Sequence, residues 1–225
     1  MTKKFGIAAL ALVLVAGLGL WAAGSRNNAG QALLPTMTAA AQETTTTAKT
    51  PVVPELTIGS PDAKVTITEY ASYTCPHCAT FHETVFKPLK ADYIDTGKVR
   101  FIFREVYFDK YGLWASVIAR CGGEMRYFGI NGILFDTQKE WAASDDANAV
   151  IENLKKIGRT AGMDDATMTQ CLEDDAMAQA MVATFQTNMT ADAVEGTPTI
   201  FVNGTKHPNM TYADLKVILD AELAK

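Results

Sequence analysis

The chain has 225 residues, 48% of them hydrophobic, which predicts one compact core rather than two full domains. Its formal net charge is -5 and its sequence contains no basic stripe. Since phosphate binding needs clustered Lys and Arg, we expect no nucleic-acid partner.

The N-terminus has the layout of an export signal. Lys3 and Lys4 precede an apolar run over residues 7–23, and small residues at Ala22, Ala23 and Gly24 permit cleavage. We therefore predict a signal peptide over 1–24. The run is close to the ~18 apolar residues of a membrane span, so an uncleaved anchor over 7–23, with the basic residues inside, remains an alternative.

The next segment, 25–54, is rich in Asn, Gln, Ala, Pro and Thr and has no sustained apolar period. Such a composition buries too little surface to order itself, so we predict a flexible linker. Residues 55–225 then form one folded domain.

Two strands and a helix are predicted in the first half of this domain. Residues 65–70 form a β-branched strand that leads into the motif Cys75-Pro76-His77-Cys78. A helix follows, with an apolar face, a kink expected at Pro88 and an end at Gly97. Residues 99–106 read as the second strand.

Helical patterns dominate from roughly 113 to 186, with acidic helix starts at 145–146 and 164–165. Residues 199–202 predict a third strand, Asn203-Gly204 a two-residue hairpin turn, and 205–207 its partner strand. Thr211 is expected to cap the last helix. The order is βαβ, helices, ββα, an α/β fold with a helical insertion at about 110–187.

The cysteine motif lies at a strand-to-helix junction, and this placement favours redox chemistry. At a helix start, unpaired backbone N–H groups and the positive dipole end stabilise a thiolate at Cys75. Pro76 suits the first helical position, and His77 can add a hydrogen bond or positive charge near the sulfur. Cys78, one turn inward, is the predicted resolving thiol.

Other functions of two closely spaced cysteines have less support in this sequence. Covalent haem requires His directly after the second Cys, but Ala79 stands there. Zinc requires four ligands, and outside the motif only His82 lies close in sequence to the pair. A purely structural disulfide and a non-catalytic metal-binding protein stay as alternatives. We expect no cofactor.

With these features the chain resembles the DsbA-like branch of the thioredoxin superfamily from about Glu55 to the C-terminus. The resemblance rests on the Cys75–Cys78 tetrapeptide, the strand before it, the helical insertion, and Gly196-Thr197-Pro198-Thr199 before the late strand. It implies a thioredoxin fold with the insertion between its βαβ and ββα halves.

The resemblance also assigns roles outside the tetrapeptide. It implies that Pro198 is a cis proline facing the catalytic disulfide, with Thr197 as its neighbour. Many DsbA proteins have Val before this proline, so the Thr197 hydroxyl puts the redox potential in question. Glu69 matches a buried acid beneath the active site that could relay the proton of Cys78. A solvent-facing Glu69 and an ordinary trans Pro198 are the alternatives.

Cys121 and Cys171 depart from family members that have two cysteines. In an oxidising compartment disulfides persist, so we expect a second, non-catalytic disulfide inside the helical insertion. Two buried free thiols are the alternative.

Together these features predict a periplasmic dithiol oxidase that introduces disulfide bonds into reduced exported proteins. The resemblance suggests that a membrane DsbB-like quinone reductase reoxidises it. An isomerase or reductase of the same fold is the runner-up, since the sequence does not determine the reduction potential.

Overall fold

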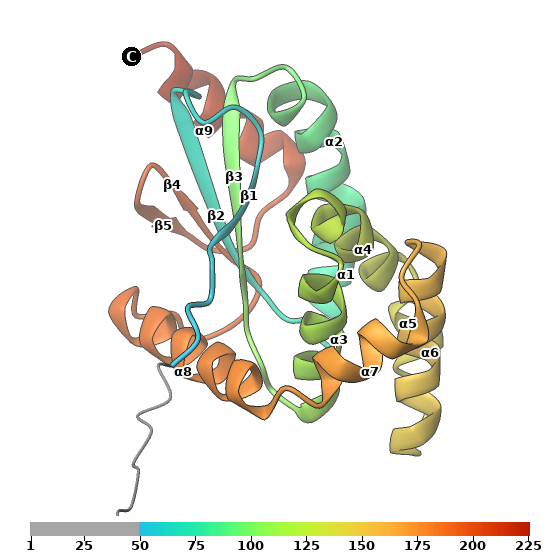
Figure 1. The fold of residues 1–225 in the computed structure, drawn as a ribbon. Helices are drawn as coiled ribbons and strands as arrows, with labels where there is room; N and C mark the ends of the chain where they lie inside the picture. Colours follow the sequence, from blue (N-terminus) through green and yellow to red (C-terminus); the bar gives the residue numbers. More distant parts are fainter. Residues whose placement is uncertain (1–49) are drawn as a thin grey trace, which may run out of the picture. The chain divides into compact units, whose positions relative to one another are not determined.

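A computed structural model describes residues 50–225 of the chain. The expected export signal or anchor and residues 25–49 of the expected linker lie outside these described residues. Residues 50–225 form a five-stranded sheet with the strand order β1-β3-β2-β4-β5 and helices around it (Figure 1). The strands are β1 (Leu56–Ile58), β2 (Val65–Ala71), β3 (Val99–Glu105), β4 (Thr199–Val202) and β5 (Thr205–His207).

The centre of the sheet is the parallel pair β2 and β3, and the outer strands run antiparallel to their neighbours. The four predicted strands are present within one residue of their expected ends. The edge strand β1 was not predicted from the sequence. Its three residues are too few to show a periodic pattern, and pairing with β3 is what makes them a strand.

The helix after β2 is longer than one regular α-helix. It runs through α1 (Pro76–Phe81), the π-helical turn η1 (His82–Phe86), α2 (Lys87–Leu89) and the π-helical turn η2 (Lys90–Ile94). The expected kink at Pro88 takes the form of these wider turns, which continue the helical path past a residue that has no N–H to donate. Gly97, at φ 75°, closes the helix by donating its N–H to the Ile94 carbonyl, 3.0 Å away.

Helices fill the chain between β3 and β4, as the fold prediction requires. They are α3 (Lys110–Cys121), α4 (Glu124–Asp136), α5 (Gln138–Trp141), α6 (Ala147–Thr160), α7 (Asp165–Leu172) and α8 (Asp175–Ala191). Asp146 and Asp164 cap α6 and α7 through their side chains, at the predicted acidic starts. Within residues 50–225, none of the helices combines the length and apolar character that crossing a membrane requires.

The hairpin and the last helix follow the predicted local signals. Asn203 and Gly204 both have positive φ, the backbone that a tight turn between β4 and β5 requires. Thr211 caps α9 (Tyr212–Leu223) by accepting the N–H of Asp214 at 3.2 Å.

The two faces of β2 pack against different helices, because successive side chains of a strand point to opposite sides. Val65, Ile67 and Ala71 belong to the main core, which includes the helix after β2 and α9. Tyr70 faces the other side and packs with Phe185 and Met189 of α8. Glu69 alternates with Tyr70, so it lies on the face of the main core.

Candidate active site

The two cysteines of the motif lie where β2 leads into α1. Cys75 is the N-cap residue of α1, and its N–H donates to the Ser72 carbonyl at 3.1 Å in a tight turn. Cys75 is 8% exposed and Cys78 is completely buried, and both are free thiols in this structure. An attacking reagent therefore reaches the Cys75 sulfur first.

The environment of Cys75 favours its thiolate. A hydrogen bond from the Cys78 thiol is the largest influence, and together with Thr197 and the backbone N–H groups of Cys78 and His77 it lowers the Cys75 pKa from 9.0 to about 5, against the opposing effect of burial. The two backbone donors among them are the unpaired N–H groups expected at a helix N-terminus. Cys75 is ionised at neutral pH.

Cys78 behaves in the opposite way. Its hydrogen bond to Cys75, its burial and the nearby Glu69 carboxylate all raise the Cys78 pKa far above the usual value of a thiol. The pair thus holds one thiolate, centred on Cys75, and one proton, held at Cys78. This asymmetry is what an attacking thiol and a resolving thiol need.

Pro76 and His77 contribute through the backbone. Pro76 is the first residue of α1, where its missing N–H has no intrahelical partner. The His77 side chain is exposed, and its influence on the Cys75 pKa comes from its main-chain N–H. The expected charge or hydrogen bond from the imidazole stays a prediction.

Thr197 and Pro198 lie against Cys75, although they come from the loop before β4. The Thr197–Pro198 peptide bond is cis. The Cys75 thiol donates to the Thr197 carbonyl oxygen over 3.6 Å. The Thr197 hydroxyl is buried and has no hydrogen-bond partner within residues 50–225.

Glu69 is 3% exposed and lies on β2 opposite Phe103 of β3 and Ile200 of β4. Burial, with a smaller contribution from the Cys75 charge, raises the Glu69 pKa from 4.5 to about 8. The solvent-facing alternative is therefore wrong. Glu69 is a buried acid that can exchange a proton near neutral pH.

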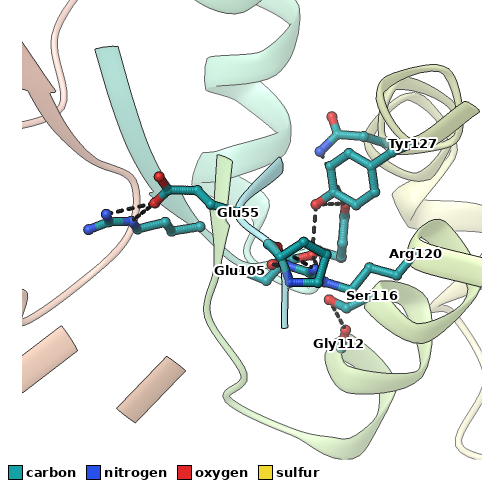
Figure 2. A network of polar contacts seen from close by, with 10 residues as sticks. Glu55, Glu105, Gly112, Ser116, Arg120 and Tyr127 are labelled. Carbon is teal, nitrogen blue, oxygen red and sulfur yellow. Dashed lines mark hydrogen bonds and ion pairs between the residues drawn. The ribbon is translucent and has the colours of Figure 1, made fainter. Parts of the chain in front are cut away.

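A buried polar chain beside the site was not predicted from the sequence. Arg120 forms two hydrogen bonds with the Glu105 carboxylate, at 2.8 and 2.6 Å, and Tyr127 donates to the same carboxylate at 2.7 Å, as Figure 2 shows. Tyr73 donates to the Tyr127 hydroxyl at 3.2 Å and so joins the chain to the segment before Cys75. The available signal in the sequence was Glu105, near the end of the predicted strand 99–106, because a carboxylate buried there needs a partner.

Gln138 is the second residue that the sequence did not indicate. Its side-chain amide donates to the carbonyl oxygens of Tyr73 and Cys75, at 2.8 and 3.0 Å. No local pattern marks it, because the contact joins α5 to a turn 63 residues earlier in the chain.

Cys121 and Cys171 are bonded to each other and connect the end of α3 to α7. Residues 50–225 contain no group of three or more His, Cys, Asp or Glu side chains arranged to hold a metal ion.

The fold and this pair of thiols define a class, the thioredoxin-like proteins. A family profile described as "Thioredoxin" matches residues 51–221. The chain belongs to the thioredoxin family, in its DsbA-like branch.

Two relatives with known sequences illustrate the relationship. A protein of Rickettsia bellii named "Putative protein-disulfide oxidoreductase" is 35% identical over 167 residues, which are 74% of this chain and 63% of the relative. Disulfide bond formation protein D of Bacillus subtilis is 27% identical over 177 residues, covering 74% of this chain and 76% of that protein. The match thus spans under two thirds of the length of the Rickettsia protein.

Solved structures agree with the fold. The crystal structure of Wolbachia pipientis alpha-DsbA1 is 26% identical with a TM-score of 0.71, and the match covers 77% of this chain and 93% of that one. The oxidised BdbD of Bacillus subtilis, at 23% identity and a TM-score of 0.68 over 76% of this chain and 93% of that one, shares the fold.

Proposed function

We propose that this chain is an exported thiol-disulfide oxidoreductase that introduces disulfide bonds into other exported proteins. The observation that carries the proposal is the asymmetry of the two thiols, an accessible Cys75 with a pKa of about 5 and a buried Cys78 with a raised pKa. A stabilised thiolate favours the reduced dithiol over the disulfide, so the disulfide form is an oxidant.

The reaction balances as a two-electron exchange. A substrate thiolate attacks Cys75 Sγ of the Cys75–Cys78 disulfide, so that an S–S bond to the substrate forms and the bond to Cys78 breaks. Cys78 leaves as a thiolate and takes up a proton. A second substrate thiolate then attacks the substrate sulfur of the mixed disulfide, which releases an oxidised substrate and the Cys75 thiolate.

The neighbouring residues have separate roles in this scheme. Pro76 and the His77 N–H support the Cys75 thiolate. Thr197 and Pro198 form the wall against which a substrate chain meets Cys75. Glu69, which raises the Cys78 pKa by its charge, is the group that gives a proton to Cys78 or takes it back.

The cycle needs reoxidation and an oxidising compartment. The resemblance to DsbA supports a membrane DsbB-like quinone reductase as the electron acceptor, and the apolar run over 7–23 supports export to the periplasm. Both a cleaved signal peptide over 1–24 and an uncleaved anchor over 7–23 are compatible with this part of the proposal.

The test is the reduction potential of the Cys75–Cys78 pair, measured against glutathione buffers, combined with the rate at which the oxidised protein forms disulfides in a reduced substrate protein. We expect a potential well above that of thioredoxin at about -270 mV and transfer of one disulfide per oxidised chain.

A potential near that of thioredoxin, with no net oxidation of substrate, would contradict the proposal and favour a reductase. Faster reshuffling of wrong disulfides than formation of new ones would favour an isomerase. Stoichiometric metal on the purified chain would favour a metal-binding protein without turnover.

A further inference from the structure

The side chain of Gln138 connects the helical insertion to the redox turn. Gln138 is the first residue of α5 and is 7% exposed. Its Nε2 lies 2.8 Å from the Tyr73 carbonyl oxygen and 3.0 Å from the Cys75 carbonyl oxygen. Both partners are carbonyls that can only accept, so the amide must present its nitrogen to them. A buried side chain with two N–H donors is what this position requires.

Hydrogen bonds to these two carbonyls fix the orientation of two peptide groups, the one after Tyr73 and the one after Cys75. The Cys75 carbonyl also accepts the N–H groups of Cys78 and Ala79, at 3.1 and 3.2 Å, which are the first bonds of α1. Fixing this carbonyl fixes the direction in which α1 leaves the turn. That direction determines how closely the N–H groups of His77 and Cys78 approach Cys75 Sγ.

The same segment is also held through the Tyr73 side chain. Asn131 of α4 donates to the Tyr73 hydroxyl at 3.1 Å, and this hydroxyl donates to Tyr127. Tyr127 in turn donates to the Glu105 carboxylate, which also accepts from Arg120 (Figure 2). The side chain of Tyr73 is thus secured by α4 and its main chain by α5. The insertion therefore holds the turn that carries Cys75 through both the side chain and the main chain of Tyr73.

We propose that Gln138 is a positioning residue that holds the main chain at Cys75 in the geometry that stabilises its thiolate, and so helps to set the reduction potential. This inference rests on the proposed redox function, since it concerns the same pair of thiols. Gln138 donates to two main-chain carbonyls and not to a sulfur, so it acts on Cys75 through these carbonyls.

The test uses Gln138→Met and Gln138→Leu, which keep a side chain of similar volume and remove both donors. The control is Gln170→Met on the exposed surface of α7. Losing roughly one net hydrogen bond should raise the Cys75 pKa by about 0.7 unit, read from the ultraviolet absorbance of the thiolate. The equilibrium constant for oxidation of glutathione by the Cys75–Cys78 disulfide should then fall about fivefold, and the reduction potential of the pair should fall by about 20 mV.

Gln138→Glu adds a test of sign. Its ionised carboxylate would face two carbonyl oxygens and repel both, so the thiolate should be destabilised more than in Gln138→Met above the pKa of the new acid. A protonated Glu can donate one hydrogen bond, so lowering the pH should bring the variant towards the parent.

A measurement on the parent covers the case in which the variants do not fold. The Gln138 side-chain amide protons should exchange slowly with solvent in NMR spectra, since both are buried and bonded, and rapid exchange would contradict the proposal. Unchanged Cys75 titration and potential in folded Gln138→Met and Gln138→Leu would overturn it as well. A parent whose Cys75 titrates near 9 would instead contradict the proposed function itself.

Discussion

The Cys75 thiol donates to the carbonyl oxygen of Thr197 over 3.6 Å, although the two residues are 122 positions apart in the chain. A thiolate at Cys75 has no proton to donate and would be repelled by this carbonyl. The buried Thr197 hydroxyl, which has no partner within residues 50–225, can then donate to the sulfur instead. The loop before β4 therefore offers an acceptor to the thiol and a donor to the thiolate.

Thr197→Val should make Cys75 less acidic. Removing the hydroxyl deletes one donor to the thiolate, so we expect the Cys75 pKa to rise by about half a unit to one unit. Below about pH 5, where Cys75 is a thiol, the lost group is a buried hydroxyl without a partner within residues 50–225, so there the free energy of unfolding should not decrease. Thr197→Ser keeps the hydroxyl and should titrate like the parent. A Thr197→Val protein with the parent's titration would show that the hydroxyl does not act on Cys75.

Substitution of Cys75 and substitution of Cys78 should have different effects on thiol oxidation. Cys75→Ser should abolish thiol oxidation, whereas Cys78→Ser should leave a reactive Cys75 that accumulates mixed disulfides with substrates, visible on non-reducing gels. Alkylation of the reduced parent at mildly acidic pH, followed by peptide mass spectrometry, should modify Cys75 first, because it is ionised and less deeply buried than Cys78. Preferential labelling of Cys78 would reverse the assignment of the two roles.

The stability of the reduced protein should depend on pH through Cys75. Because folding lowers the Cys75 pKa from 9.0 to about 5, the folded state favours the thiolate more than the unfolded state does. This contribution is complete above about pH 9 and is lost as the pH falls towards about 5. Urea denaturation at several pH values, parent against Cys75→Ser, should show the difference. Parallel profiles for the two proteins would contradict it.

Glu69→Gln should slow the exchange step that involves Cys78, because it keeps the shape but removes the titrating group. Stopped-flow reduction of the oxidised protein measures this rate. Equal rates in parent and variant across neutral pH would remove the proton-relay role.

Glu69→Gln should also change how stability depends on pH. The contribution of Glu69 to stability has the opposite pH dependence from that of Cys75. Folding raises the Glu69 pKa from 4.5 to about 8, so the folded state holds this proton more tightly. Its stabilising effect is complete below about pH 4.5 and is lost as the pH rises towards about 8. The oxidised Glu69→Gln variant should not lose stability over this pH range. The oxidised protein is suitable for the test because burial, the larger cause of the Glu69 pKa shift, persists when Cys75 and Cys78 are bonded to each other. Denaturation of the oxidised proteins avoids titration of the thiols.

The Cys121–Cys171 bond should stabilise the fold without taking part in turnover. It closes a loop with a sequence separation of 50, for which loop entropy predicts ~4 kcal/mol, and strain in the folded state can halve the measured value. The double variant Cys121→Ala/Cys171→Ala should therefore unfold at lower urea concentration and still oxidise substrates. Non-reducing peptide mapping that finds both thiols free in the exported protein would contradict the assignment.

Features that depend on neighbouring residues could be predicted from the sequence. The turn at Asn203 and Gly204 and the caps at Asp146, Asp164 and Thr211 form where the local pattern placed them. The redox pair could also be recognised, because a cysteine before Pro76 at a strand-to-helix junction meets the N–H groups of its own helix. In each case the interacting groups lie within a few residues of one another.

Other features were decided by the tertiary structure. The strand β1 exists because β3 pairs with it, and Glu69 is buried because two neighbouring strands and the main core enclose it. Gln138 and the Glu105–Arg120 pair gain their partners from segments far along the chain. Local sequence determines helix ends, turns and the chemistry of adjacent groups, whereas burial and long-range hydrogen bonds arise only when packing brings distant segments together and excludes water from between them.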